Sequence, residues 1–257
     1  NHLLAKRQIK LINFILLFCL LNISSPAYAS EPIVTSQSEA IAEDNIHHLL
    51  SQFEQWHVAG RDDLALDILT KMQKISPDHQ NTLAIEALLA AEQAKPRQTE
   101  TLLIKLSQAN SNHPWIKKIN TLLRLNTEDK SQLLQARMYA RGGQSAKAIN
   151  LMDTLFDGEP PSAELTLLYW QTHQQLNYNS KKARNGFQDL ASQYPENPTF
   201  KLALYKNKII NGLVSDSLID AIILLTKDPK VSIEAASIWK DAILELPLQR
   251  SSRKSIE

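Results

Sequence analysis

The sequence is short of several residue types on which particular functions depend. Its 257 residues include one cysteine, Cys19, and six glycines, of which Gly142 and Gly143 form the single adjacent pair. A lone cysteine cannot form an intramolecular disulfide, and this glycine pair does not make a phosphate-binding loop. Basic and acidic residues number 28 and 27, so no basic excess favours binding to nucleic acid or to an anionic membrane surface.

Residue patterns typical of catalysis or metal binding are also missing. None of the seven histidines forms an i, i+4 pair with an intervening glutamate, and no nucleophile elbow is present. His47 and His57 fall on the same predicted helix face with Glu54, but ten residues of helix separate them by about 15 Å, too far for a shared metal. We therefore expect solvated or partner-facing histidines, no cofactor, no metal and no enzymatic activity.

Residues 1–29 have the pattern of a secretory signal peptide. Three basic residues precede the apolar run 11–21 (LINFILLFCLL), and residues 27–29 (AYA) supply the small residues that signal peptidase requires. The run is shorter than the ~20 residues of a membrane-spanning helix, so we expect cleavage before Ser30 rather than a membrane anchor. Cleavage removes Cys19 and three positive charges, leaving 25 basic against 27 acidic residues. Residues 30–45 are predicted to be a flexible leader that can become helical near its end.

Prolines recur along the rest of the chain at nearly constant intervals. Four of the five have an apolar or small residue twelve places upstream, and the fifth has a serine there: Pro77 with Ala65, Pro114 with Leu102, Pro160 with Ala148, Pro195 with Ala183, and Pro229 with Ser217. The intervals are 37, 46, 35 and 34 residues, close to the 34-residue period of tetratricopeptide repeats. Each such repeat is a helix pair that buries its apolar face only by stacking on its neighbours. The sequence therefore predicts an all-α tetratricopeptide solenoid of about five helix pairs over residues 46–247.

The apolar periodicity gives more detail about individual helices. It places Ile46, Phe53 and Trp56 on the inner face of the first helix, and Asp62 or Asp63 can cap the second helix. Residues 115–125 form a surplus or partly formed helix, which explains the 46-residue interval. In the fifth pair, Leu204, Gly212, Ala221 and Leu224 occupy repeat positions, and a last helix, 231–246, ends at Pro247 and uses Ile233, Ala236 and Ile243.

The third pair matches the repeat pattern best. Counted from Asp129, its eighth and twentieth places are Ala136 and Ala148, where the two helices approach so closely that only small residues fit. Tyr139 is the aromatic residue at the eleventh place, and Gly143 makes the turn. A repeat of this kind is a scaffold, so the pattern indicates the fold and says little about function.

In such repeats the first helix of each pair lines a concave groove. The weak candidates for partner binding there are Lys130, Arg137, Arg141, Gln175 and Lys206. We expect exposed leucines beside them, including Leu133, Leu165 and Leu202. A groove of this mixed character suits a peptide or protein segment with acidic and apolar residues. The alternative is a groove covered by its own neighbours or by a further part of the chain.

Four stretches go beyond a general repeat. They are residues 132–143 (QLLQARMYARGG), 155–161 (LFDGEPP) with 168–170 (LYW), 235–240 (AASIWK), and Leu246 with Pro247. In this order and at these separations they resemble the N-terminal periplasmic region of the cellulose synthase operon protein C family. The resemblance is strongest over residues 133–252 and thins toward Ile46.

The resemblance implies a periplasmic scaffold of cellulose biosynthesis and export. Family members carry a long tetratricopeptide superhelix and a C-terminal outer-membrane barrel, hold proteins of the synthase complex, and are thought to guide nascent β-1,4-glucan. Residues 1–257 depart from the family pattern, because they include neither the barrel nor most of the repeats, and the resemblance does not by itself imply that they grip glucan. Glucan binding usually requires exposed aromatic residues. Trp56, Trp115, Trp170 and Trp239 are the candidates, although Trp170 and Trp239 are expected in the core.

Two other interpretations stay open from the sequence. Lytic transglycosylases also begin with a signal peptide and an α-helical superhelix, with the catalytic glutamate in a later domain. A general periplasmic assembly adaptor is the second. Because the chain begins at Asn1 rather than Met and ends in the polar stretch 248–257 without a capping repeat, we expect it to be part of a longer protein.

Overall fold

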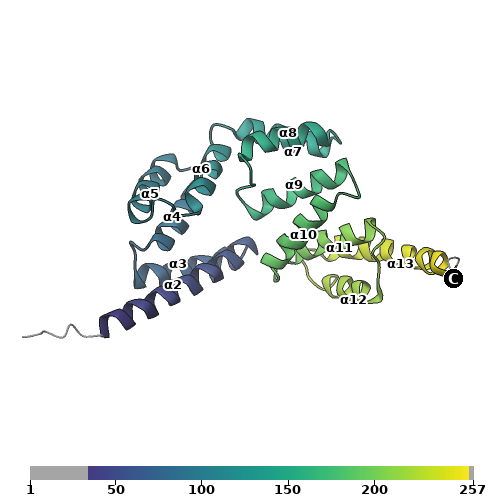
Figure 1. Cartoon of the computed structure of the whole chain (residues 1–257), viewed down its shortest axis with the longest axis horizontal. Helices are drawn as coiled ribbons and strands as arrows, with labels where there is room; N and C mark the ends of the chain where they lie inside the picture. The colour runs from purple at the N-terminus through teal and green to yellow at the C-terminus, as the bar shows by residue number, and fades with distance from the viewer. Residues whose placement is uncertain (1–33, 255–257) are drawn as a thin grey trace, which may run out of the picture. The chain divides into compact units, whose positions relative to one another are not determined.

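The chain folds into helices that pack in sequence order. The computed structural model describes the backbone of residues 34–254 and the side chains of residues 43–244, so the predicted signal peptide lies outside the described residues. The chain divides into two units, 1–43 and 44–257, and the packing below concerns the second. Within residues 34–254 there are twelve helices, labelled in Figure 1: α2 (Val34–Val58), α3 (Asp62–Ile75), α4 (Gln80–Glu92), α5 (Pro96–Ala109), α6 (Trp115–Asn126), α7 (Lys130–Arg141), α8 (Ser145–Phe156), α9 (Ala163–Leu176), α10 (Lys181–Gln193), α11 (Pro198–Ile210), α12 (Asp216–Leu225) and α13 (Ser232–Lys254).

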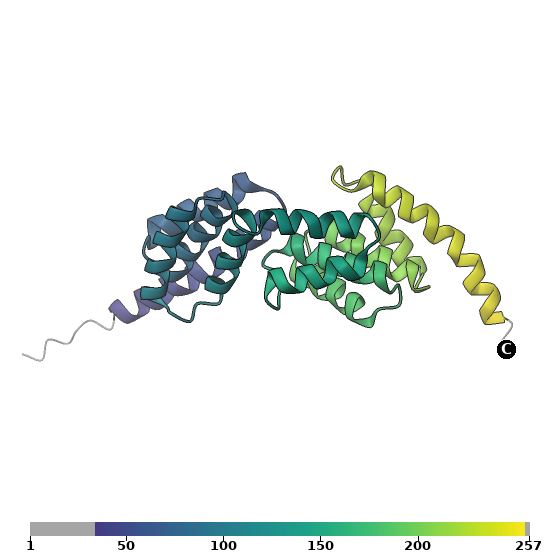
Figure 2. The ribbon, with the colours of Figure 1, turned by 90° about the horizontal axis from the view of Figure 1, so that it is seen from above.

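Three of the predicted pairs are prominent, since extensive contacts join α4 to α5, α7 to α8 and α9 to α10. The predicted fifth pair is different, because α12 packs more extensively on α13 than on α11. Neighbouring pairs are joined by α8 with α9 and α10 with α11. In Figure 2 the same order can be followed by colour from α2 to α13. This confirms an all-α repeat fold of the tetratricopeptide kind. The helix that fills the long proline interval, α6, is fully formed and packs mainly on α4.

The small residues of the repeat pattern lie where the helices of a pair approach each other. Ala136 and Ala148 are both completely buried between α7 and α8, and Ala65 and Ala183 occupy the matching places in other pairs. The turn glycines Gly60 and Gly143 have φ values of +67° and +73°, a backbone conformation that disfavours residues with a Cβ. The repeat period and its turns are therefore explained by close helix contact and by backbone geometry.

Details of the first helix pair differ from expectation. Trp56 is 37% exposed, because Ile46 and Phe53 form the buried face of α2 without it. Neither aspartate caps α3: its N-cap is Arg61, whose side chain makes no capping hydrogen bond. The Arg61 guanidinium instead pairs with Asp63, at 3.0 Å from Nη2 to Oδ2. Helix α2 begins at Val34, within the stretch predicted to be a leader.

The predicted register of the last helices was also wrong. Ile233 is 88% exposed, and Ala236 and Ile243 are exposed as well. The buried side of α13 consists of Ala235, Ile238 and Ala242, following Val231. Both triplets have helical spacing, so periodicity alone could not choose between them. The helix also continues past Pro247 to Lys254, since an internal proline removes one main-chain hydrogen bond without ending a helix in every case.

Two further apolar residues lie outside the core against expectation. Leu224 is 65% exposed, because α12 buries Leu218 and Ile222 instead. Trp239 is 38% exposed on α13, while Trp170 is half-buried beside α10. Trp239 is thus accessible on the surface, and the core around α12 and α13 consists of smaller aliphatic residues.

Candidate binding site

Of the five residues predicted to line one groove, only two lie in the same hollow of the surface. Gln175 of α9 and Lys206 of α11 line the same hollow, which has a volume of about 290 Å³. We call it the α9–α11 groove. Its lining residues are Gln171, Gln174, Gln175, Tyr178, Phe187, Ala203, Lys206 and Ile210.

The polar groups of the α9–α11 groove are mostly uncharged amides. The Gln175 Oε1 atom accepts a hydrogen bond from Ser145 Oγ at 3.3 Å, which fixes its position relative to α8. Lys206 Nζ lies 3.5 Å from Glu234 Oε1 of α13, so its positive charge is compensated by a neighbouring carboxylate. Both partners of that ion pair are more than half exposed, so its contribution to stability is small.

Arg137 lines a second hollow, which we call the central cavity. It has a volume of about 430 Å³, and side chains from α2, α3, α4, α6 and α9, together with Tyr194 just after α10, also line it. Lys130 and Arg141 lie exposed near the two ends of α7, so the five predicted residues do not form one site. The expected exposed leucines are absent at the three positions named above, because Leu133, Leu165 and Leu202 are buried between helices.

The central cavity contains a cluster of titratable groups that the sequence did not indicate. His57 Nε2 lies 3.0 Å from Glu92 Oε1, and Asp62 is a more distant partner at 3.8 Å. The hydrogen bond with Glu92 raises the pKa of His57 above its usual value, and this outweighs the opposing effect of burial. His57 is therefore half-buried and paired within the chain, rather than fully solvated or turned toward a partner as expected.

Lys118 and Tyr194 face the same cavity. Burial lowers the pKa of Lys118, although Glu54 and Glu92 act against that shift. Burial likewise raises the pKa of Tyr194 to about 12, and the nearby Glu54 carboxylate contributes to the shift. These groups bring together residues of α2, α4 and α6 and the residue that follows α10, which no local sequence pattern connects.

Another histidine is buried against expectation. His113 precedes α6 and is 7% exposed, with its Nε2 atom 3.2 Å from Asn81 Oδ1 of α4. Burial and the neighbouring His79 lower its pKa. Asn81 is itself buried, so this polar contact links α4 to the start of α6 inside the core.

A third hollow gathers the residues of the sequence motifs. Pro160 and Pro161 line it together with Trp170 of α9 and Gly186 of α10, around a volume of about 370 Å³. A Cβ atom on Gly186 would lie 2.2 Å from Trp170 Cε2, so a side chain there would collide with the indole. Lys182 Nζ lies 5.8 Å from the centre of the Trp170 ring. The motif residues thus serve the packing of α9 on α10.

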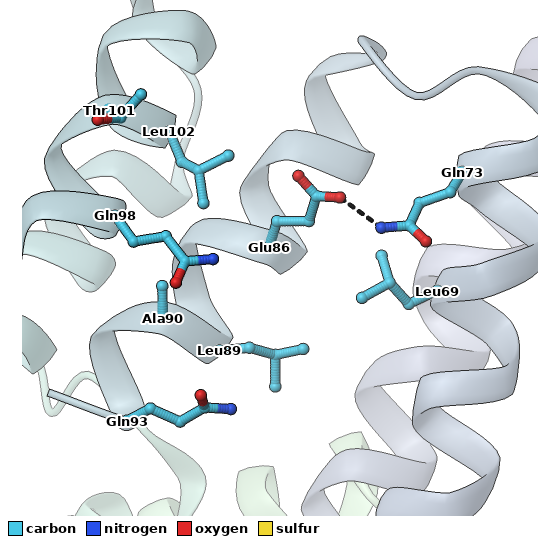
Figure 3. Close-up of a pocket in the computed structure, with 9 residues that line it drawn as sticks. All are labelled: Leu69, Gln73, Glu86, Leu89, Ala90, Gln93, Gln98, Thr101 and Leu102. Carbon is cyan, nitrogen blue, oxygen red and sulfur yellow. Dashed lines mark hydrogen bonds between the residues drawn. The ribbon is translucent and has the colours of Figure 1, made fainter. Parts of the chain in front are cut away.

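A pocket among α3, α4 and α5 was not predicted from the sequence (Figure 3). Three glutamines, Gln73, Gln93 and Gln98, surround a floor that includes Leu89. Its volume is about 490 Å³, and one of its amides is already paired, since Gln73 Nε2 donates to Glu86 Oε1 at 2.5 Å. We call it the α3–α5 pocket. It contains amides but no aromatic residue, which makes it a useful comparison for the α9–α11 groove.

Sequence reasoning missed the most exposed aromatic side chain of residues 43–244. Tyr178 follows α9 and is 61% exposed, whereas the candidates considered for aromatic contacts were all tryptophans. Gln171 and Gln174 were missed as well. The available signal was the spacing along one helix, since Gln171 lies three residues before Gln174 and four before Gln175. Residues three or four apart share a helix face.

Neither a metal centre nor a membrane span is found in the described part of the chain. Among those residues, histidines and carboxylates do not gather into a group of three that could hold a metal ion. No described helix combines the length and the apolarity needed to cross a bilayer.

The known proteins that match this chain by sequence share one name. No family model matches the chain. Cellulose synthase operon protein C from Xanthomonas axonopodis pv. citri is 28% identical over 202 residues, or 77% of this chain and 13% of the relative. The protein of the same name from Salmonella typhimurium is 27% identical over 210 residues, or 81% of this chain and 18% of the relative. The chain therefore spans less than a fifth of these relatives.

A solved structure shows a similar fold. The crystal structure of the flexible tandem repeat domain from the C component of bacterial cellulose synthase aligns with 78% of this chain and 98% of that domain. The TM-score is 0.51 and the sequence identity is 19%. At this identity the match supports the repeat architecture and carries no information about individual side chains.

Proposed function

Since the chain is a homologue of cellulose synthase operon protein C, we propose that it is a non-enzymatic repeat scaffold of cellulose biosynthesis and export. It holds proteins of the synthase complex and helps to guide nascent β-1,4-glucan toward an outer-membrane pore. The observation that carries the proposal is the similarity to relatives of this one name across about four fifths of the chain.

The proposal assigns the chain to the periplasm. Residues 1–29 act as a cleaved signal peptide, and residues 46–247 form the repeats that hold the partners. Repeat surfaces are suited to this task, because stacked helix pairs present extended faces on which several partners can be held at once. The titratable groups of the central cavity support a structural role, since the His57–Glu92 pair joins two helices of the repeat stack.

The protein contacts of the proposal are assigned to the α7 surface. Arg137 and Arg141 lie on one side of α7, four residues apart, and both are exposed. Together with Lys130 they make a basic helix face. Such a face favours a partner segment that carries acidic residues, because opposite charges speed association and fix its orientation.

Site-specific photo-cross-linking in living cells tests this assignment. A photoreactive amino acid replaces Arg137 or Arg141, and Lys105 on α5 serves as an exposed control position. We expect positions 137 and 141, but not 105, to cross-link to a protein encoded with the cellulose synthase, identified by mass spectrometry. Cross-links from these positions only to peptidoglycan-processing proteins would overturn the proposal and favour the lytic transglycosylase interpretation. Cross-links to assembly proteins alone would favour the general adaptor.

A further inference from the structure

The α9–α11 groove has an aromatic side chain at its edge. The Tyr178 side chain is 61% exposed and lies two residues after the last residue of α9, Leu176, which is 55% exposed. Exposed aromatic rings supply a large, rigid contact area at low conformational cost. A ring in this position is available for a flat ligand surface that lies along the groove.

The wall of the groove consists of amide side chains. Gln171, Gln174 and Gln175 of α9 all line the groove. Gln174 is 7% exposed, and among the described residues its Nε2 atom has no hydrogen-bond partner. An unpaired buried amide is destabilising, so a rotation of this side chain that brings Nε2 to a ligand oxygen at the groove would be favoured.

The floor of the groove is apolar. Phe187 lies beneath it on α10, with Ala203 and Ile210 from α11. The cation among its lining residues, Lys206, is already compensated by Glu234. The groove thus offers uncharged donors and acceptors, an aromatic ring and an apolar floor, and its lining residues offer an acidic peptide no unpaired positive charge.

We propose that this groove binds a short stretch of β-1,4-glucan, an inference that rests on the function proposed above. Each hydroxyl group of a pyranose both donates and accepts hydrogen bonds, as a carboxamide does, and the C–H faces of the ring are apolar. Tyr178 supports one sugar face, and the three amides bond the hydroxyl groups along one edge. The volume of about 290 Å³ is at the small end of ligand sites and suits one or two sugar rings.

Titration of the full chain with cellohexaose, followed by calorimetry, tests the proposal. We expect Tyr178→Ala to weaken binding about five- to tenfold, since a stacked ring contributes of the order of one factor of ten. Tyr178→Phe keeps the ring and should retain affinity within about twofold. Gln174→Leu removes the buried amide and should also weaken binding, with thermal unfolding used to verify that the variant folds.

The α3–α5 pocket provides a matched control. Gln98→Leu removes an amide from a pocket that has no aromatic residue, and it should leave cellohexaose binding unchanged (Figure 3). Maltohexaose, which has the same sugar units in a different linkage, should bind more weakly. No binding of cellohexaose by the wild-type chain would overturn the proposal. Equal affinity of Tyr178→Ala and wild type would overturn it as well.

The sugar site and the proposed function can fail separately. If deletion of the gene lowers secreted cellulose but cellohexaose does not bind, the scaffold function stands and the sugar site is wrong. If cellohexaose binds at Tyr178 but deletion leaves secretion unchanged, the groove binds sugar and the export function is wrong. A peptide that cross-links at Tyr178 and is not displaced by cellohexaose would assign the groove to a protein partner and overturn the glucan proposal.

Discussion

Gly186 of α10 lies directly against the indole of Trp170 of α9. The distance from a Cβ atom placed on Gly186 to Trp170 Cε2 would be 2.2 Å, and the distance to Nε1 would be 2.3 Å. No side chain can be accommodated there unless the tryptophan moves. The fourth helix pair therefore approaches closely because one helix carries a glycine and the other a large flat ring.

Gly186→Ala should destabilise the protein by about 1–3 kcal/mol, because the added methyl group forces Trp170 out of place. The gain in helix propensity from alanine offsets at most about 1 kcal/mol of this cost. Asn185→Ala, at the exposed neighbouring position, is the matched control. Chemical denaturation measures both variants. If Gly186→Ala is as stable as Asn185→Ala, the close contact does not exist in solution.

The pair of His57 and Glu92 predicts a shifted histidine titration. The pKa of His57 should lie above 6.5, and Glu92→Gln should lower it by removing the hydrogen-bonded carboxylate. Asp62→Asn should lower it less, because Asp62 is 3.8 Å away and acts only through its charge. NMR titration of the imidazole carbon-bound protons gives these values directly. A His57 pKa at or below 6.5 would contradict the assignment.

The same pair fixes the sign of the pH dependence of stability. A histidine whose pKa is raised on folding stabilises the protein fully below its unfolded pKa, and this contribution is lost as the pH rises through the folded pKa. The stability difference between wild type and His57→Gln should therefore be larger at about pH 5.5 than at about pH 8.5. Denaturation at the two pH values measures it, and a difference that grows with pH would refute the prediction.

The register of α13 can be tested with two isoleucines. Ile238 is 4% exposed and Ile233 is 88% exposed, although both are apolar and lie on the same helix. Ile238→Ala should cost about 2–5 kcal/mol of unfolding free energy. Ile233→Ala should change stability by less than about 0.5 kcal/mol. Urea unfolding distinguishes them, and a larger loss at position 233 would restore the register expected from the sequence.

Export of the chain is predicted from residues 1–29 alone. The mature protein isolated from the periplasmic fraction should begin at Ser30, since residues 27–29 present alanines at the first and third places before the cut. Mass spectrometry of the N-terminal peptide identifies this end. Ala29→Arg should block processing, and Asn22→Gln is a control that leaves the cleavage site intact. A chain that retains residues 1–29 after export would contradict the prediction.

The sequence predicted the fold because its strongest signals are local and repeated. Small residues such as Ala136 and Ala148 mark where helices touch, and the prolines mark the period. The register of α13 was missed because Ile233 and Ile238 both fit helical spacing, and only the neighbouring helices decide which side is covered. Local patterns carry no information about such long-range packing.

The candidate site was harder to predict from the sequence, because its residues also come together through long-range packing. Gln175 and Lys206 line one groove because both belong to the first helices of neighbouring pairs. Tyr178 was overlooked because it follows the helix in a turn, outside the repeat positions that line a groove. The contact of His57 with Glu92 joins residues 35 apart, and nothing in either helix specifies that pairing.

The amount of cellulose secreted by cells that lack the gene tests the central claim most directly. Chromosomal deletion and complementation with the wild-type gene are compared by weighing the acid-insoluble glucan in the culture. A scaffold of cellulose export predicts that deletion lowers this yield strongly and that complementation restores it. An unchanged yield after deletion, with normal growth and an intact synthase, would contradict the account.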